Sequence, residues 1–319
     1  MSTVTRWFAE LHDFDAIAEA SKAWDIDFRL LEGAAGSGEL ETVVAGGAIV
    51  QRNRLGWKLH QRGAPPGGSF TFGLGVDAGQ SLPWCGQHAR DDWLLSFPVN
   101  GEYDSVSDES FHCYSLTFDE GLVSETAHVL GGPSESEAAL PTGVFNVGRK
   151  QTEALRAMVR GIMRAARGGP DGEASEALAN GIEQDLLPAV LRALMRRHPA
   201  KPPTSRLRSL AVRRSTEFIE QVGGRPVTVR ELCEVAGVSW RTLDYAFKDH
   251  FGVSPKRYLT TLRLNSAHQD LLASRPGDRR VDRIGARWGF WHLGRFARDY
   301  RRLFGELPSE TLQRARTNG

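Results

Sequence analysis

The chain has 319 residues, enough for roughly two domains of ~150 residues each. Hydrophobic residues make up 40% of it and charged residues 25%, which excludes a wholly disordered, collagen-like or coiled-coil protein. No window approaches the ~18 uninterrupted apolar residues of a membrane-spanning helix, and the N-terminus lacks the apolar block of a secretory signal. Cys85, Cys113 and Cys233 are too scattered for a disulfide framework or a zinc cluster. We expect a cytoplasmic protein with reduced thiols and no membrane association.

The formal net charge of +1 hides an uneven distribution along the chain. From Ser205 onward there are 22 Lys and Arg against 12 Asp and Glu, whereas the first 204 residues hold 18 against 27. An acidic part is therefore joined to a basic part. A basic domain favours a polyanion such as DNA, because each phosphate contact releases counterions. A solvated basic surface is the alternative that charge alone leaves open.

The N-terminal part is predicted to be rich in β-strands. After a short helix near residues 13–24, residues 40–120 contain short apolar, β-favouring runs separated by turn-forming stretches such as residues 63–68. This pattern is typical of a sandwich or a small barrel. We therefore expect a cupin-like β-barrel sensor domain with helices in an α+β protein of two domains.

Two apolar stripes at helical spacing follow the β-rich region. One runs over residues 155–163, and the other over residues 182–194, where Pro188 is expected to kink or interrupt the helix. The stripes could cover the barrel or pair two subunits of a homodimer. Three prolines within residues 199–203 then predict an extended linker. The resulting domains are a sensing and dimerisation domain over 1–198, a linker over 199–204 and a helical domain over 205–319.

The C-terminal third contains signals for a helix-turn-helix motif. A helix over residues 206–222 ends at Gly223, and Thr228 with Glu231 forms a capping box at the start of the next. Gly237 supplies a turn, and Ser239 caps a second helix that ends near residues 251–252. Two short helices joined by a glycine-bearing turn place the second helix in a DNA major groove.

The same pattern recurs further along the chain. Leu232 and Gly237 correspond to Ile284 and Gly289, 52 positions later, and residues 243–255 correspond to residues 296–308, 53 positions later. The second copy therefore has one extra residue in its turn. A helix from Pro255 to about residue 273 connects the copies, and its stiffness would suit two successive major grooves, ~34 Å apart.

These residues resemble a known family. Residues 228–312 look like the DNA-binding domain of AraC/XylS-type bacterial transcription regulators, on the matches Phe251-Gly-Val-Ser-Pro255, Arg263-Leu-Asn-Ser-Ala267, Gly289-Phe290, Phe296-Ala-Arg298 and Phe304-Gly-Glu-Leu-Pro308. The resemblance covers about a quarter of the chain, and the upstream part matches the family only in plan. It implies a non-enzymatic, sequence-specific regulator of transcription on double-stranded DNA, commonly an activator that contacts RNA polymerase.

Carried over by position, the base-facing residues of the first reading helix are Arg241, Asp244 and Tyr245. On the second helix they are Gly294, Arg295 and Arg298, although Gly294 has no side chain with which to read a base. An arginine can donate two hydrogen bonds to guanine, and an aspartate can accept one from cytosine. The remaining candidates for DNA contact, mostly to phosphate, are Ser239, Lys248, Lys256, His292, Arg301 and Arg302.

A β-barrel joined to a DNA-binding domain predicts a switch that responds to a small molecule. The candidate effector-binding residues mix aromatic walls with polar groups: Trp57, His60, Arg62, Trp84, His88 and Trp93. We expect no catalytic residues, no metal site and no cofactor. A metal-dependent cupin-type enzyme is disfavoured because His60, His88 and His112 form no H-x-H pair. An architectural DNA-binding protein without an effector is a further alternative, and a repair protein with a reactive cysteine has no supporting motif.

Overall fold

The computed structural model describes residues 4–21, 24–32, 36–77, 82–84, 87–89, 92–99, 101–130, 140, 142–169, 172–195, 198–199, 206–223, 227–274, 281–290 and 292–318. The chain divides into two compact units. The first comprises residues 1–27, 37–56 and 61–201, and the second comprises residues 28–36, 57–60 and 202–319. Within the described ranges, no helix is both long and apolar enough to cross a membrane.

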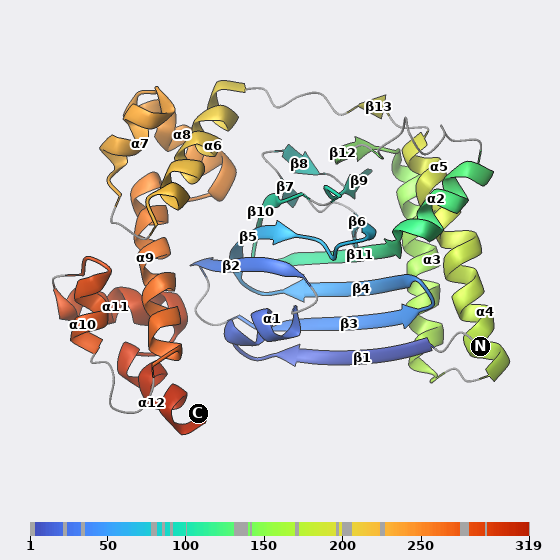
Figure 1. The fold of residues 1–319 in the computed structure, drawn as a ribbon, viewed down its shortest axis with the longest axis horizontal. Helices are drawn as coiled ribbons and strands as arrows, with labels where there is room; N and C mark the ends of the chain where they lie inside the picture. The colour runs from blue at the N-terminus through green and yellow to red at the C-terminus, as the bar shows by residue number, and fades with distance from the viewer. Residues whose placement is uncertain are drawn as a thin grey trace. The chain divides into compact units, whose positions relative to one another are not determined.

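The described strands form one sheet of eight strands and one of five (Figure 1). The order in the larger sheet is β1 (Val4–Leu11), β3 (Gly38–Ala45), β4 (Ala48–Leu55), β11 (Phe111–Asp119), β6 (Ser69–Gly75), β9 (Trp93–Ser96), β12 (Gly143–Asn146) and β13 (His198–Pro199). The order in the smaller sheet is β2 (Asp25–Glu32), β5 (Lys58–Ala64), β10 (Tyr103–Ser107), β7 (Leu82–Trp84) and β8 (Gln87–Ala89). Among the described strands, neither sheet pairs its first strand with its last. The expected cupin-like barrel is therefore corrected to two open sheets.

The helices of the first unit are α1 (Asp15–Ala20), α2 (Glu120–Val129), α3 (Arg149–Arg167), α4 (Gly172–Asn180), the π-helix η1 (Gly181–Leu186) and α5 (Leu187–Met195). The stripes predicted on α3 and on η1–α5 are buried against the larger sheet, in one core with strand residues such as Val50 and Leu116. They therefore serve the core of this chain first. Pro188 cannot donate a hydrogen bond to the preceding turn, and the turn before it is widened into the π-helix η1 instead of being broken.

The second unit is mostly helical. Its helices are α6 (Arg206–Gln221), α7 (Val229–Ala236), α8 (Trp240–Phe251), α9 (Pro255–Leu272), α10 (Val281–Arg287), α11 (Leu293–Phe304) and α12 (Pro308–Asn318). Residues 28–36 and 57–60 also belong to it: the side-chain amide of Asn265 accepts from the main-chain N–H of Leu30 and donates to its carbonyl, both at 2.9 Å. Most of the predicted linker, residues 200–204, lies outside the described residues.

Candidate DNA-binding surface

The first helix-turn-helix motif consists of α7 and α8. The hydroxyl of Thr228 accepts from the N–H of Glu231, whose carboxylate accepts from the N–H of Thr228, which confirms the capping box. Gly237 then turns the chain with a φ of 67°, a left-handed conformation that favours glycine. Ser239 caps α8 by accepting from the N–H of Thr242. These local signals fix where both helices begin and end.

The second motif consists of α10 and α11. Gly289 takes the place of Gly237, with a φ of 78°. His292 occupies the N-cap of α11 three positions after this glycine, whereas Ser239 follows Gly237 by two, which confirms the extra residue in the turn. The side chain of His292 makes no capping hydrogen bond and is exposed. Trp291, expected beside it, lies outside the described residues.

The side chains that hold the two motifs together are buried at corresponding positions. Those predicted as core are all confirmed to be so: Leu232, Leu243, Phe247, Ile284, Phe296 and Tyr300. Gly285 leaves room for Phe296, since a Cβ added there would lie 3.3 Å from its ring. His268 of α9 bonds the hydroxyl of Tyr300, which also bonds Thr311 at 2.8 Å. The linking helix is thereby fastened to the second motif.

The exposed face of α8 carries the predicted base-reading residues. Arg241 donates to the hydroxyl of Tyr245 at 3.4 Å, and the guanidinium groups of Arg241 and Arg208 lie 5.8 Å and 5.7 Å from the Tyr245 ring centre. Asp244 is mostly buried and forms a 2.7 Å ion pair with Lys248. Arg241 and Tyr245 therefore form an exposed pair, whereas one carboxylate oxygen of Asp244 already holds Lys248.

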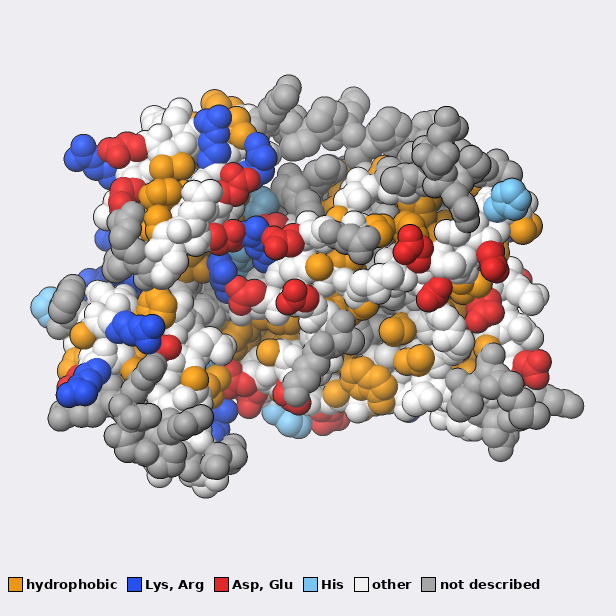
Figure 2. All heavy atoms as spheres, viewed as in Figure 1, with side chains coloured by type: hydrophobic (Ala, Val, Ile, Leu, Met, Phe, Trp, Pro, Cys, Tyr) orange, Lys and Arg blue, Asp and Glu red, His pale blue; other side chains and the backbone are white. Residues whose placement is uncertain are grey.

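The exposed face of α11 is strongly cationic. Arg295 and Arg298 flank Asp299, at 3.4 Å and 3.8 Å from its carboxylate oxygens. Arg301 and Arg302 are exposed on the following turn. Lys and Arg side chains are visible over the C-terminal helices in Figure 2. One carboxylate against four guanidinium groups leaves this helix with the charge that phosphate contacts require. The individual DNA contacts of these residues stay predictions.

Sequence reasoning missed one pair of exposed residues. Trp240 and Leu293 are the first residues of α8 and α11, 53 positions apart, and their exposed fractions are 61% and 47%. Large apolar side chains at the starts of both reading helices can contact thymine methyl groups. The repeat contained the signal, because the two positions correspond.

A substitution at Gly294 tests whether the exposed face of α11 is free of neighbouring atoms. A Cβ added there meets no atom within 4 Å. We expect Gly294→Ala to raise the free energy of unfolding by about 0.5–1 kcal/mol, because alanine loses less backbone entropy in a helix. Urea unfolding followed by circular dichroism measures the change. A loss of stability would show that this face is covered.

Three of the proposed effector residues have partners elsewhere. Trp57 and His60 are buried in the second unit, where Trp57 packs against Gly36 and His60 bonds the hydroxyl of Tyr258 at 3.1 Å. Arg62 forms a 2.7 Å ion pair with Glu102. The structure thus gives each of these side chains a packing or pairing role.

Trp84 and Trp93 share one cluster of the first unit. Buried Trp84 packs with Tyr103 and with Leu95 of the larger sheet, and Trp93 is half-buried against them. The indole N–H of Trp84, the amide nitrogen of Gln61 and the hydroxyl of Ser107 are buried without a hydrogen-bond partner among the described residues. The side chain of His88 is not among those that the structure describes. The structure therefore brings together two of the six candidates.

Two helix-turn-helix motifs on one linking helix define a tandem helix-turn-helix protein. A family described as a helix-turn-helix domain matches residues 232–314. The probable thc operon regulatory protein of Rhodococcus erythropolis is 39% identical over 102 residues, 32% of this chain and 31% of its own length. The XylDLEGF operon transcriptional activator of Pseudomonas putida is 39% identical over 103 residues, 32% of each chain.

A solved structure is also similar to this segment. The crystal structure of a probable AraC family transcriptional regulator from Rhodopseudomonas palustris shares 44% identity over 33% of this chain and 97% of its own, with a TM-score of 0.31. The C-terminal segment of the chain is therefore similar to the DNA-binding domain of AraC/XylS-type transcription regulators. It matches about a third of the length of the first two curated relatives.

Proposed function

We propose that this chain is a sequence-specific, DNA-binding transcription regulator that acts in the cytoplasm as a homodimer. The observation that carries the proposal is the repeat itself: α8 and α11 start with corresponding exposed residues and rest on corresponding buried ones. Two such helices suit two successive major grooves of one DNA duplex. Footprinting is expected to reveal two protected segments about one helical turn apart for each subunit. Protection of a single groove would contradict reading by both motifs.

Arg298 is the strongest candidate for a base contact, because it is exposed on the turn after the start of α11. We expect Arg298→Ala to weaken binding to a specific site by about 1–3 kcal/mol and binding to random DNA much less. Affinities for both DNAs, measured at one salt concentration, test this. Arg301→Ala is the matched control and should weaken both about equally. Equal losses for Arg298→Ala would make it a phosphate contact.

We further propose that the regulator is an activator that contacts RNA polymerase and responds to a small molecule held between its two sheets. The relative from Pseudomonas putida is called a transcriptional activator, which supports the direction of the response. The buried polar atoms of Gln61, Trp84 and Ser107 support a binding site between the sheets, because a ligand there could supply their missing hydrogen-bond partners. Thermal-shift screening of the full chain against metabolites tests it, since a ligand that binds the folded state raises Tm.

The alternatives have distinct signatures. An architectural DNA-binding protein would show weak sequence preference and no metabolite response. A repair protein needs a reactive thiolate. Of the two cysteines that the structure describes, burial raises the pKa of Cys113 to about 12 and raises that of Cys233 as well. A metal-dependent enzyme would bind a stoichiometric metal. In the part of the chain that the structure describes, no three His, Cys, Asp or Glu side chains gather as ligands.

A further inference from the structure

The outer strand of the larger sheet is unusually exposed. β1 pairs with β3 on one side, and no described strand lies on its other side. Five of its eight residues are exposed, including Trp7 at 37% and Phe8 at 44%. Figure 2 shows hydrophobic side chains over the edge where Figure 1 places β1. The other three exposed residues are Thr5, Arg6 and Glu10, so the edge carries charged as well as large apolar side chains. An open edge with large exposed apolar side chains can pair with another chain, and its charges then select the partner that fits.

The direction of the main-chain groups of β1 follows from one hydrogen bond. The N–H of Val4 donates to the hydroxyl of Ser175 in α4, at 2.9 Å, and thus faces away from β3. Main-chain groups alternate in direction along a strand, and the pairing of β1 with β3 continues without a bulge from Val4 to Leu11. The N–H and C=O groups of Arg6, Phe8 and Glu10 therefore face the open edge.

We propose that a second copy of this chain adds to this edge, with the two β1 strands antiparallel and Phe8 on the twofold axis. In this register, the outward groups of Phe8 meet those of the partner's Phe8, and Arg6 lies opposite the partner's Glu10. The contact is isologous, as a twofold dimer requires. This inference names the interface of the homodimer proposed above and rests on it.

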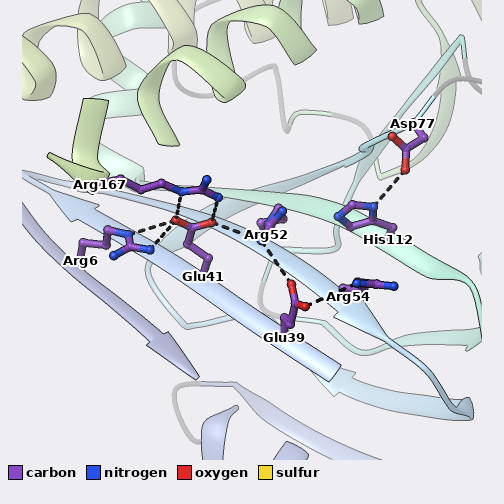
Figure 3. Close-up of polar contacts among 8 residues, drawn as sticks. All are labelled: Arg6, Glu39, Glu41, Arg52, Arg54, Asp77, His112 and Arg167. Atoms are coloured by element: carbon purple, nitrogen blue, oxygen red, sulfur yellow. Dashed lines mark hydrogen bonds and ion pairs between the residues drawn. The ribbon is translucent and has the colours of Figure 1, made fainter. Parts of the chain in front are cut away.

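Charge and side-chain packing favour a second copy over an unrelated partner. Arg6, Phe8 and Glu10 share one face of the sheet, so each Arg6 meets a carboxylate and each Phe8 meets an aromatic ring across the axis. Arg6 uses Nε and Nη2 to hold Glu41, which leaves Nη1 for the partner's Glu10 (Figure 3). The apolar stripes of α3 and α5 are buried within the chain, so they do not compete as the dimer surface.

A disulfide across the axis tests the register. Directly opposite residues of a hydrogen-bonded antiparallel pair have Cα atoms about 5.5 Å apart, a distance that a disulfide spans. We expect Phe8→Cys to form a covalent dimer on mild oxidation of the full chain. Glu10→Cys is the matched control, because the two cysteines introduced at position 10 of the two copies would lie ~14 Å apart along the strands. The unsubstituted protein, oxidised in parallel, measures crosslinking through the native cysteines. Equal crosslinking of both variants would overturn the register.

A second variant tests the interface without new thiols. Phe8→Pro removes an N–H that faces outward, so the pairing of β1 with β3 is kept while the edge bond at the axis is lost. We expect at least a tenfold rise in the dimer Kd by sedimentation, with an unchanged circular dichroism spectrum. If Phe8→Pro dimerises as tightly as the parent, the dimer interface lies elsewhere; the proposed β1 interface is then wrong, but the proposed homodimer is not. A parent that is monomeric overturns both the edge and the proposed homodimer.

Discussion

Replacing Glu41 with glutamine is expected to lower the free energy of unfolding of the first unit by about 3 kcal/mol, the value that corresponds to the lowered pKa of this carboxyl group. The side chain is 1% exposed on β3 and accepts hydrogen bonds from Arg167 at 2.7 and 2.8 Å and from Arg6 at 2.9 and 3.0 Å (Figure 3). Arg52 approaches at 3.4 Å. Glutamine removes the buried charge on which the partly exposed guanidinium groups of Arg6 and Arg167 converge, so these charge-assisted hydrogen bonds are weakened. Urea unfolding measures the loss.

Glu39→Gln is the matched control for this substitution. Glu39 lies two residues away on the same face of β3, about a third exposed, and its contacts with Arg52 and Arg54 are 3.4 Å long. A loss of less than about 1 kcal/mol is expected, because partly exposed ion pairs contribute little. Equal losses in the free energy of unfolding for the two variants would show that Glu41 contributes no more to stability than Glu39 does.

The same carboxylate makes the protein sensitive to acid. The hydrogen bond from Arg167, with those from Arg6, lowers the pKa of Glu41 from its usual 4.5 to about 2, against the opposing effect of burial. A pKa that is lower in the folded state stabilises the fold above the unfolded value. This contribution, about 3 kcal/mol, is complete above about pH 5 and is lost as the pH falls towards 2. The Tm of the parent should therefore fall across this window more steeply than that of Glu41→Gln.

Replacing Phe296 with alanine is expected to lower the stability of the second unit by about 3–5 kcal/mol and to abolish specific DNA binding. Phe296 is buried on α11, with its ring centre 4.9 Å from Phe290 and 5.7 Å from Tyr300. Removing a buried ring loses its packing and leaves a cavity. α11 would then no longer be held against α10, although no residue of its exposed face has changed.

Two measurements separate this effect from loss of a DNA contact. Hydrogen exchange should show reduced protection in α10 and α11, and the affinity for a specific site should fall with it. Arg301→Ala, on the same helix but exposed, should change stability by less than about 0.5 kcal/mol. Intact protection in Phe296→Ala would mean that the second motif does not depend on this ring.

The fold of the C-terminal third is determined by short-range features of its sequence. The caps at Thr228 and Ser239, the glycines at 237 and 289, and the repeated apolar positions act over a few residues, where hydrogen bonding and helical periodicity decide the outcome. For that reason the helices and the core of both motifs are where the sequence predicts them.

In the β-rich part, the arrangement of the strands was decided by tertiary structure. Short strands give the number of segments but not their partners, because strand pairing joins residues far apart in the chain, such as Phe8 with Glu41 and Phe111 with Leu55. Two open sheets therefore replace the expected barrel, His60 is taken up in the second unit, and of the two roles left open for the helical stripes the structure shows packing in the core. The sequence alone determined a tandem helix-turn-helix protein. Only the fold placed a buried carboxylate among arginines and left Phe8 at an open edge, since burial and edges exist only once strands are paired.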